Sequence, residues 1–537
     1  MTADREQHWS YDPDATVVMP AALGQPPDVT TDLPRASGAE PAAESGATGR
    51  HQDPAGPGVV DDTGSAVARH SSVMAVGSII SRLTGFVRTA AIGAAIGVLA
   101  IGDAYNLANT LPGMVYELLL GGVLASVVVP LLVRARTRDT DRGEAYTQRL
   151  LTLAVIFLGG ATVVAVLCAP LFTSLLTNAS TTVADQRLIT TLSYLLLPMI
   201  FFYGMAALFA AVLNTRGHFA MPTFTPILNN LVVIAMTATF LFLPVERVGD
   251  ASSLSALQIV VLGLGTTLGI VVQATGLWPA LRRVNFRWRW RFDFRQLYLR
   301  ELARVSAWML VYVLISQVGV VVVLKLAKMA ADNGDDVSGP AVFNNAFLIF
   351  MMAHGIVAVS IITALMPRMA AAAAENRHED LVHQLSLGTR LTAVVLVPTT
   401  VAYVVLGRPL AVTLFAFGNY GHQEAVATGW VIAVAGLGLV PFAISQLQLF
   451  TFYAMPDTRT PALVNLPVVG VRIAIDVLLY VVLPFAWVAA GLMFGNAVSF
   501  LLAAVLGYWL LRRRIGRLGL ARVLATLGRL AVAAGTA

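Results

Sequence analysis

Charged side chains are scarce in this sequence, and cysteine is almost absent. Aspartate, glutamate, lysine and arginine make up 12% of the 537 residues, whereas an average soluble domain has about 25%. The single cysteine, Cys168, excludes a disulfide framework. No metal-ligand spacing, nucleophile triad or phosphate-binding glycine loop is found. We therefore predict no enzymatic activity, no catalytic residue, no metal site and no cofactor.

Apolar residues take the place of the missing charges. They make up 57% of the chain, and its mean hydropathy is +0.73. Many apolar runs reach the ~20 residues that a membrane-spanning helix needs. The pattern predicts an all-α, multi-pass membrane protein. Twelve spans are expected, at residues 72–98, 103–134, 147–176, 187–214, 220–244, 254–281, 301–328, 339–372, 382–406, 423–453, 459–483 and 485–511.

Composition and span spacing divide the chain into five parts. Residues 1–70 are rich in Pro, Ala, Gly, Asp and Glu and poor in large apolar residues, which predicts a disordered tail. Residues 71–281 and 301–511 hold six spans each, and we expect them to form an N-lobe and a C-lobe around a central cavity. Residues 282–300 form a basic amphipathic linker. Residues 512–537 begin a further helix that is truncated.

The charges of the loops predict the orientation in the membrane. Arginines follow every even-numbered span, whereas the loops after the odd-numbered spans carry mainly carboxylates. The positive-inside rule then places the N-terminus and the linker in the cytoplasm. Residues 286–294 alternate aromatic side chains with arginines. We expect this segment to lie on the anionic cytoplasmic leaflet rather than to bind nucleic acid.

An internal repeat relates the two sets of six spans. Asn230 in the fifth span and Asn465 in the eleventh are 235 residues apart, as are Ser81 and Ser316 in the first and seventh. Six is an even number, so the two halves share one orientation. Transporters built from parallel repeats bind substrate between the halves and rock one half against the other. Chance matches between apolar helices are the alternative.

Two arginines stand deep in the first span. Arg82 lies about ten residues into it, or ~15 Å at 1.5 Å per residue. Arg88 follows six residues later, ~120° around a regular helix, with Gly85 between them. A charge at this depth is costly and marks a functional site by default, and the guanidinium fork suits a phosphate ligand. The alternative is that both arginines pair within the protein and hold helices together.

Three further polar residues are candidates for contact with substrate. Asp103 opens the second span, either as the N-cap of its own helix or as a counter-ion to Arg88. Glu117 either pairs with an arginine of the first span or faces the cavity and carries a proton. Gln317 occupies the position of the second half that matches Arg82. Lys328, near the outer end of the seventh span, is expected to extend its ammonium group to the membrane surface.

Arg472 and Asp476 lie four residues apart in the eleventh span, on one helix face. An internally neutralised pair is one interpretation. The other is a coupling-ion site for Na⁺ or H⁺ at Asp476, with Asn465 as a second candidate. Membrane potential is a further source of energy, since one charge that crosses 100 mV is worth about 2.3 kcal/mol.

The first two spans resemble the lipid II flippase family (MurJ/MviN) of the multidrug/oligosaccharidyl-lipid/polysaccharide exporter superfamily. The matching residues are Ser81, Arg82, Gly85, Phe86, Arg88, Asp103, Ala104, Leu111, Pro112, Ser126 and Pro130. The resemblance implies a fourteen-helix fold that carries lipid-linked peptidoglycan precursor from the cytoplasmic to the outer leaflet of the cell membrane. It also implies that Arg82, Arg88 and Asp103 belong to a central cavity.

The sequence departs from the family pattern at several positions. Tyr116 and Glu117 stand where the family often has arginines, and the last two family helices are missing apart from their start. The function predicted is that of a lipid II flippase, with membrane lipids and proteins of cell-wall synthesis or regulation as further partners. The alternatives are a cation-coupled exporter of drugs or other glycolipids, and a non-transporting scaffold for cell-wall synthesis.

Overall fold

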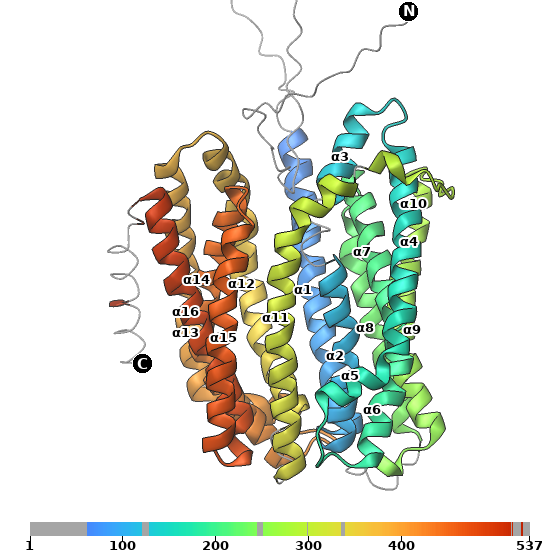
Figure 1. Ribbon diagram of the computed structural model, residues 1–537, viewed down its shortest axis with the longest axis vertical. Coiled ribbons are helices and arrows are strands. Elements are labelled where there is room, and N and C mark those ends of the chain that lie inside the picture. Colours follow the sequence, from blue (N-terminus) through green and yellow to red (C-terminus); the bar gives the residue numbers. More distant parts are fainter. Residues whose placement is uncertain are drawn as a thin grey trace, which may run out of the picture.

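The computed structural model describes residues 62–120, 128–243, 251–297, 299–334, 339–516, 518 and 528–529. Helices dominate these residues, and none of them lies in a β-strand (Figure 1). The α-helices are α1 Asp62–Ile96, α2 Ala100–Leu120, α3 Val129–Arg138, α4 Glu144–Leu167, α5 Ala169–Leu176, α6 Val183–Leu196, α7 Met199–Thr215, α8 Ala220–Leu241, α9 Ala256–Gly276, α10 Trp278–Arg283, α11 Leu299–Asn333, α12 Pro340–Ala374, α13 His378–Phe415, α14 His422–Ala454, α15 Arg459–Val482 and α16 Val488–Ile515.

Eleven helical segments within the described residues are long and apolar enough to cross a membrane. Each of them coincides with one of the twelve predicted spans. The remaining prediction, 103–134, falls on α2 and α3, between which residues 121–127 lie outside the described part of the chain. The prediction of an all-α, multi-pass membrane protein is confirmed.

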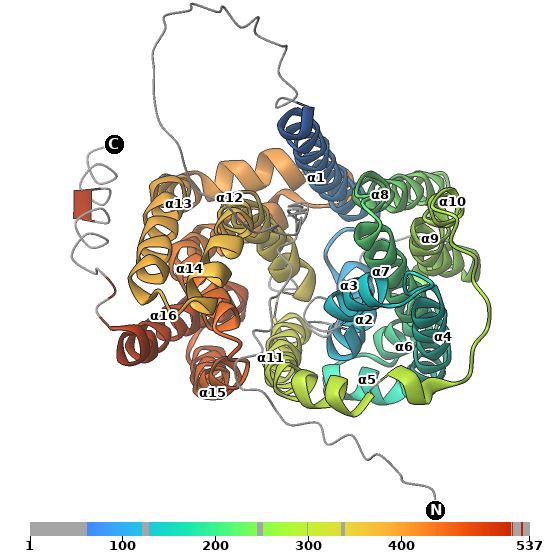
Figure 2. The same cartoon turned by 90° about the horizontal axis from the view of Figure 1, so that it is seen from above.

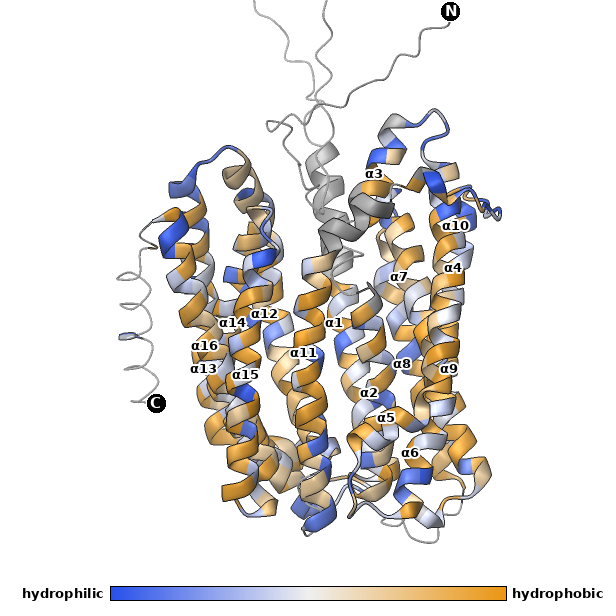
Figure 3. Ribbon diagram, viewed as in Figure 1, coloured by the Kyte–Doolittle hydropathy of each residue, from blue (hydrophilic) through white to orange (hydrophobic). Residues whose placement is uncertain are grey.

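The outer surface of the helix bundle is apolar. Large side chains such as Val163, Leu167, Val481 and Phe242 are more than half exposed. Hydrophobic residues predominate along the helices, and hydrophilic residues occur at the ends and in patches within some helices (Figure 3). A soluble protein rarely exposes apolar patches of this extent. The surface is therefore suited to lipid.

The predicted boundaries at residues 70/71 and 511/512 differ from the ends of the helices in the structure. α1 begins at Asp62, although residues up to 70 were expected to be disordered. Extending a helix by one turn adds hydrogen bonds without the cost of a new nucleus, and Ala66, Ala68 and Arg69 favour the extension. At the other end, residues 512–515 are the last turn of α16, which stops at Gly516 with φ 88°. The predicted tail 1–61 and nearly all of 517–537 lie outside the described residues.

Helices from equivalent positions in the two halves pack alike. α1 packs on α8 and α8 on α9, as α11 packs on α15 and α15 on α16. Asn230 of α8 donates to the Ser81 carbonyl oxygen and Thr84 Oγ1 at 3.1 and 3.0 Å. Asn465 of α15 donates to the Tyr312 carbonyl oxygen and Ser316 Oγ at 3.0 and 2.8 Å. The matching asparagines therefore make matching contacts, as the repeat predicts.

Viewed from the end of the bundle, the helices form two groups (Figure 2). Helices α12–α16 lie together on one side and α2–α10 on the other, with α1 and α11 between them. α11 contacts both groups, through α15 and α16 on one side and α2 and α5 on the other. α1 packs on α8 and also touches α12 and α13. The first helix of each half therefore lies at the junction of the two groups.

The predicted linker is an extended segment that lies along α4. The Gln148 side chain of α4 donates to the Arg287 carbonyl oxygen at 2.6 Å and accepts from Arg291 Nε at 2.8 Å. Asp293 accepts from Arg149 Nε at 2.8 Å, and this hydrogen bond lowers the pKa of the Asp293 carboxyl. Phe286 is buried, whereas Trp290 and Phe292 are exposed. Only part of the aromatic series is therefore free to meet a membrane surface.

Replacing Gln148 by leucine is expected to release this segment. The substitution removes two hydrogen bonds worth about 1 kcal/mol each, so the segment opens locally more often. Cleavage by trypsin after Arg287, Arg289 or Arg291 should be about 30-fold faster than in the wild type, a factor that corresponds to about 2 kcal/mol. Mass spectrometry of the fragments measures the rate. Gln384→Leu in α13 is the control, and equal rates in both variants would contradict the prediction.

Candidate functional site

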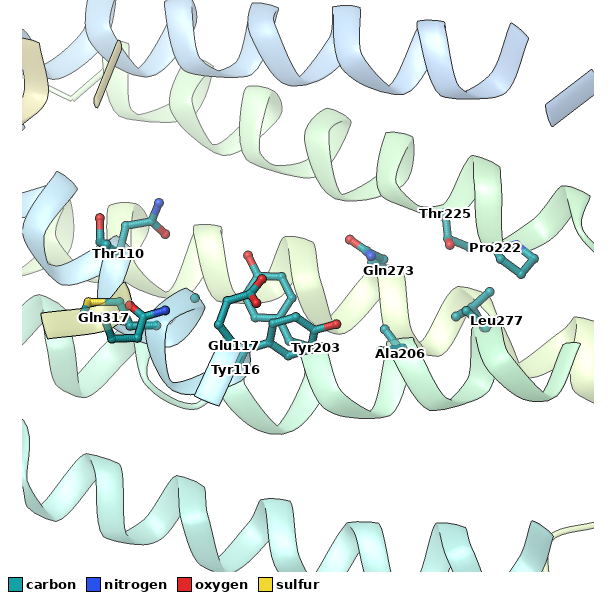
Figure 4. A pocket seen from close by; sticks show the side chains of 15 residues that line it. Thr110, Tyr116, Glu117, Tyr203, Ala206, Pro222, Thr225, Gln273, Leu277 and Gln317 are labelled. Carbon is teal, nitrogen blue, oxygen red and sulfur yellow. The ribbon is translucent and has the colours of Figure 1, made fainter. Parts of the chain in front are cut away.

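A cavity of about 640 Å³ lies between α2, α7, α8, α9 and α11, within the range of small-molecule sites, roughly 300–1,000 Å³. Figure 4 shows part of its lining. The lining residues are Asn109, Thr110, Gly113, Met114, Tyr116, Glu117, Tyr203, Ala206, Ala207, Ala210, Pro222, Thr225, Gln273, Leu277 and Gln317. All but Gln317 come from α2–α9 and the residue after α9. Gln317 comes from α11, so the cavity lies where the two halves meet.

Glu117 is the only charged residue in this lining. Its side chain is exposed to the cavity, and within the described residues no cation lies within salt-bridge distance of it. The rings of Tyr116 and Tyr203 lie beside it with centroids 5.7 Å apart. Gln317 Oε1 is buried without a hydrogen-bond partner in the described part of the chain. Of the predicted site residues, the structure brings Glu117 and Gln317 together in one cavity.

Arg82 and Arg88 lie outside that lining, on α1. Both are half-buried, and neither forms an ion pair within the described residues. Arg82 lies against Gly355 of α12, where a side chain would collide with its guanidinium group. Arg88 faces away from Arg82: its charge acts on Tyr105 and Tyr203, and its Nε is buried without a hydrogen bond among the described residues. The two arginines diverge, as their spacing on the helix predicts.

Asp103, which lies on α2, caps the N-terminus of α12. Its N–H is bonded to the Leu99 carbonyl oxygen at 2.8 Å, so it lies inside the first turn of α2 and is not the N-cap. Its carboxylate accepts from the Ala341 N–H at 2.8 Å, at the start of α12. That helix begins at Gly339-Pro340 and has no side-chain cap of its own. Asp103 therefore supplies the missing cap across the junction of the two halves.

Lys328 joins the two halves at the same end of the molecule. It is 2% exposed, and its Nζ lies 2.7 Å from Asp332 on α11 and 3.8 Å from Asp185 on α6. Thr181 Oγ1 lies 2.5 Å from Asp332 Oδ2. The prediction that Lys328 extends to the membrane surface is wrong, because the two carboxylates hold its ammonium group in the interior. The spacing of Lys328 and Asp332 could have indicated one pair, but nothing in the sequence indicates Asp185.

The loop after α13 closes the same end. Asn419 donates from its backbone N–H to the Ala94 carbonyl oxygen at 2.8 Å and from its side chain to the Ala95 carbonyl oxygen at 2.7 Å. These carbonyls belong to the last turn of α1. We call the contacts of Asp103, Lys328, Asp185, Asp332 and Asn419 the polar seal. Glu117 lies 14 residues beyond Asp103 on α2, about 21 Å along the helix, so the cavity and the polar seal occupy different levels.

The two coupling-ion candidates of α15 are not brought together. Asp476 is fully buried and its Oδ2 lies 3.5 Å from Arg472 Nε. Asn465 instead binds α11. The described residues contain no group of three or more His, Cys, Asp or Glu side chains that could hold a metal ion. The internally neutralised pair is the arrangement observed.

Comparisons with known proteins agree with the fold. The chain matches the family described as "Lipid II flippase MurJ" over residues 92–537, a range that begins after Arg82 and Arg88. It is 25% identical over 431 residues to a probable lipid II flippase MurJ of Rhizobium meliloti, covering 78% of this chain and 76% of that protein. It is 26% identical over 448 residues to a lipid II flippase MurJ of Burkholderia cenocepacia, covering 81% and 82%.

Solved structures show the same architecture. A lipid II flippase MurJ in an inward closed conformation superposes with a TM-score of 0.68 at 16% identity, over 86% of this chain and 91% of that one. A transporter of the MOP superfamily from Pyrococcus furiosus superposes with a TM-score of 0.61 at 15% identity, over 83% and 95%. The family match covers most of the described helices. The chain belongs to the lipid II flippase MurJ family.

Proposed function

We propose that the protein is a lipid II flippase, which moves polyprenyl-diphosphate-linked peptidoglycan precursor from the inner to the outer leaflet. The observation that carries the proposal is the pair Arg82 and Arg88, which stand half-buried in a membrane-spanning helix at the junction of the halves with no ion-pair partner among the described residues. An unpaired charge inside a membrane is expensive. A diphosphate that enters the junction would neutralise it with charge-assisted hydrogen bonds.

The orientation follows from the arginine-rich loops. α3, the α10 end and the linker lie at one end of the bundle (Figure 1), and the positive-inside rule assigns that end to the cytoplasm, together with the N-terminus. The cavity reaches Pro222 and Leu277, next to these loops. The polar seal lies at the opposite, outer end. This combination of an inner cavity and a sealed outer end is that of an inward-facing transporter.

Transport then requires the two halves to move so that the cavity closes towards the cytoplasm and opens towards the outer side. We assign residues 71–281 to an N-lobe and 301–511 to a C-lobe, with 282–300 as the linker between them. The headgroup would enter from the cytoplasmic end, the polar seal would open, and the polyprenyl chain would stay in the lipid that surrounds the bundle. Membrane potential could drive one step, at about 2.3 kcal/mol per charge per 100 mV.

Replacing Arg82 by alanine tests the proposal. Removing one partner of a buried charge contact costs about 2–5 kcal/mol, so flipping should slow by at least about 30-fold. The measurement is the accessibility of labelled precursor in the outer leaflet of cells depleted of the protein and rescued by each variant. Arg88→Ala should act in the same direction.

The matched control is Arg187→Ala, which removes an exposed arginine of α6 and should leave flipping unchanged. Cation export, the alternative favoured by Glu117, predicts a different pattern: efflux that survives Arg82→Ala and fails with Glu117→Gln. Normal flipping in Arg82→Ala and Arg88→Ala cells would refute the proposed role of the arginines.

A further inference from the structure

The cavity has the wrong charge for a phosphate. Its one charged lining residue is Glu117, and a carboxylate repels a diphosphate. The polar residues around it are Asn109, Thr110, Thr225, Gln273 and Gln317, which offer amide and hydroxyl oxygens. No lining residue is a lysine or an arginine. The cavity is therefore suited to a part of the ligand other than the diphosphate, which Arg82 and Arg88 would hold.

The surroundings of Glu117 fit an organic ammonium group. The carboxylate is exposed to the cavity and unpaired within the described residues, so it can accept hydrogen bonds from an incoming donor. The rings of Tyr116 and Tyr203 beside it present π-faces, which attract a cation within about 6 Å of the ring centroid. A carboxylate with two aromatic rings is a combination that recognises amines.

The arginines of α1 and the carboxylate of Glu117 face different parts of the junction between the halves. Tyr203 lines the cavity with Glu117, whereas Arg82 and Arg88 lie outside that lining. A ligand long enough to reach from the cavity to α1 would meet Glu117 at one end and the arginines of α1 at the other. Such a site is complementary to a zwitterionic headgroup, with phosphate at one end and an amine at the other.

We propose that Glu117, Tyr116 and Tyr203 form a subsite for a primary ammonium group carried by the headgroup of the transported precursor. The proposal rests on the proposed flippase function and specifies its substrate class: a lipid-linked diphosphate whose headgroup has a free amine. Glu117 binds the ammonium group through charge-assisted hydrogen bonds, and the tyrosine rings cover its remaining faces.

The test compares two probes on the purified full-length protein in nanodiscs. One is a lipid-linked precursor with a free amine on its headgroup peptide, and the other is the same molecule with that amine acetylated. Wild-type protein should bind the free-amine probe about tenfold more tightly, the effect expected of one charge-assisted hydrogen bond. Glu117→Gln should bind both probes equally, at the affinity of the acetylated one. Glu379→Gln, which removes an exposed carboxylate of α13, should behave as the wild type.

The outcomes separate this proposal from the flippase function. If the wild type binds the two probes equally and tightly, the ammonium subsite is refuted while the flippase function stands. If it binds neither probe, the flippase function fails and the subsite with it. If Glu117→Gln keeps the tenfold preference, another group recognises the amine and the proposal is wrong. Thermal unfolding curves that match the wild type establish that Glu117→Gln is folded.

Discussion

Replacing Lys328 by methionine is expected to open the polar seal and to lower the thermal stability of the protein. The Lys328 ammonium group is shared by Asp332 at 2.7 Å and Asp185 at 3.8 Å, and the three side chains are 3%, 6% and 9% exposed. Removing it leaves two buried carboxylates without their cation. Breaking a buried ion pair in this way costs about 3–5 kcal/mol. Because Asp185 and Lys328 lie on helices of different halves, part of that cost is relieved when the halves separate.

Two measurements check this prediction. The unfolding temperature should fall by several degrees. A cysteine introduced in place of Ala341, which is fully buried beside Asp103, should react with an impermeant maleimide added from outside only when Lys328 is replaced. The background is Cys168→Ser, which removes the single native cysteine.

The controls separate loss of the ion pair from loss of a lysine. Lys325→Met removes a half-buried lysine of the same helix and should leave both readouts unchanged. Adding Asp185→Asn and Asp332→Asn to Lys328→Met should restore part of the stability, because it removes the two carboxylates that lost their cation, whereas the nearby carboxylate of Asp103 remains. If the introduced cysteine stays unreactive and the unfolding temperature is unchanged in Lys328→Met, the cluster does not hold the halves together.

The spans and the repeat could be predicted because they depend on local patterns. Apolar runs of spanning length identify membrane helices from composition alone, and Asn230 and Asn465 occupy matching positions in the two halves. The i,i+4 spacing of Arg472 and Asp476 likewise indicated an ion pair on one helix face, which the structure contains at 3.5 Å.

The partner of Asp103 and the contact of Lys328 with Asp185 could not be predicted, because they depend on how distant helices meet. Asp103 binds the backbone of Ala341, 238 residues further along the chain. The cap is needed because the Ala341 N–H has no partner within its own helix and Gly339 has no side chain to supply one, yet neither fact says which carboxylate comes near. Asp185 of α6 likewise meets Lys328 of α11 only because the two halves pack together. Sequence spacing specifies which face of a helix a residue occupies, but not what that face touches.

Replacing Gly355 by leucine is expected to abolish flipping while the Arg82 charge is retained. Gly355 lies in the middle of α12, and a Cβ there would meet the guanidinium group of Arg82. The arginine must then leave the junction between α1 and α12 or push the helices apart. Either change removes it from the place where we propose that it meets the diphosphate. The loss should equal that of Arg82→Ala, at least about 30-fold.

Gly470→Leu in α15 is the matched control, since nothing lies within 4 Å of a Cβ at that position. Glycine in a helix costs about 1 kcal/mol relative to alanine, so both substitutions favour helix formation, and only the one at 355 meets Arg82. The double variant Arg82→Ala, Gly355→Leu should flip precursor no more slowly than either single variant, because both remove the same contact. If the two losses instead multiply, Gly355 acts through something other than Arg82, and the proposed role of the contact between them is wrong.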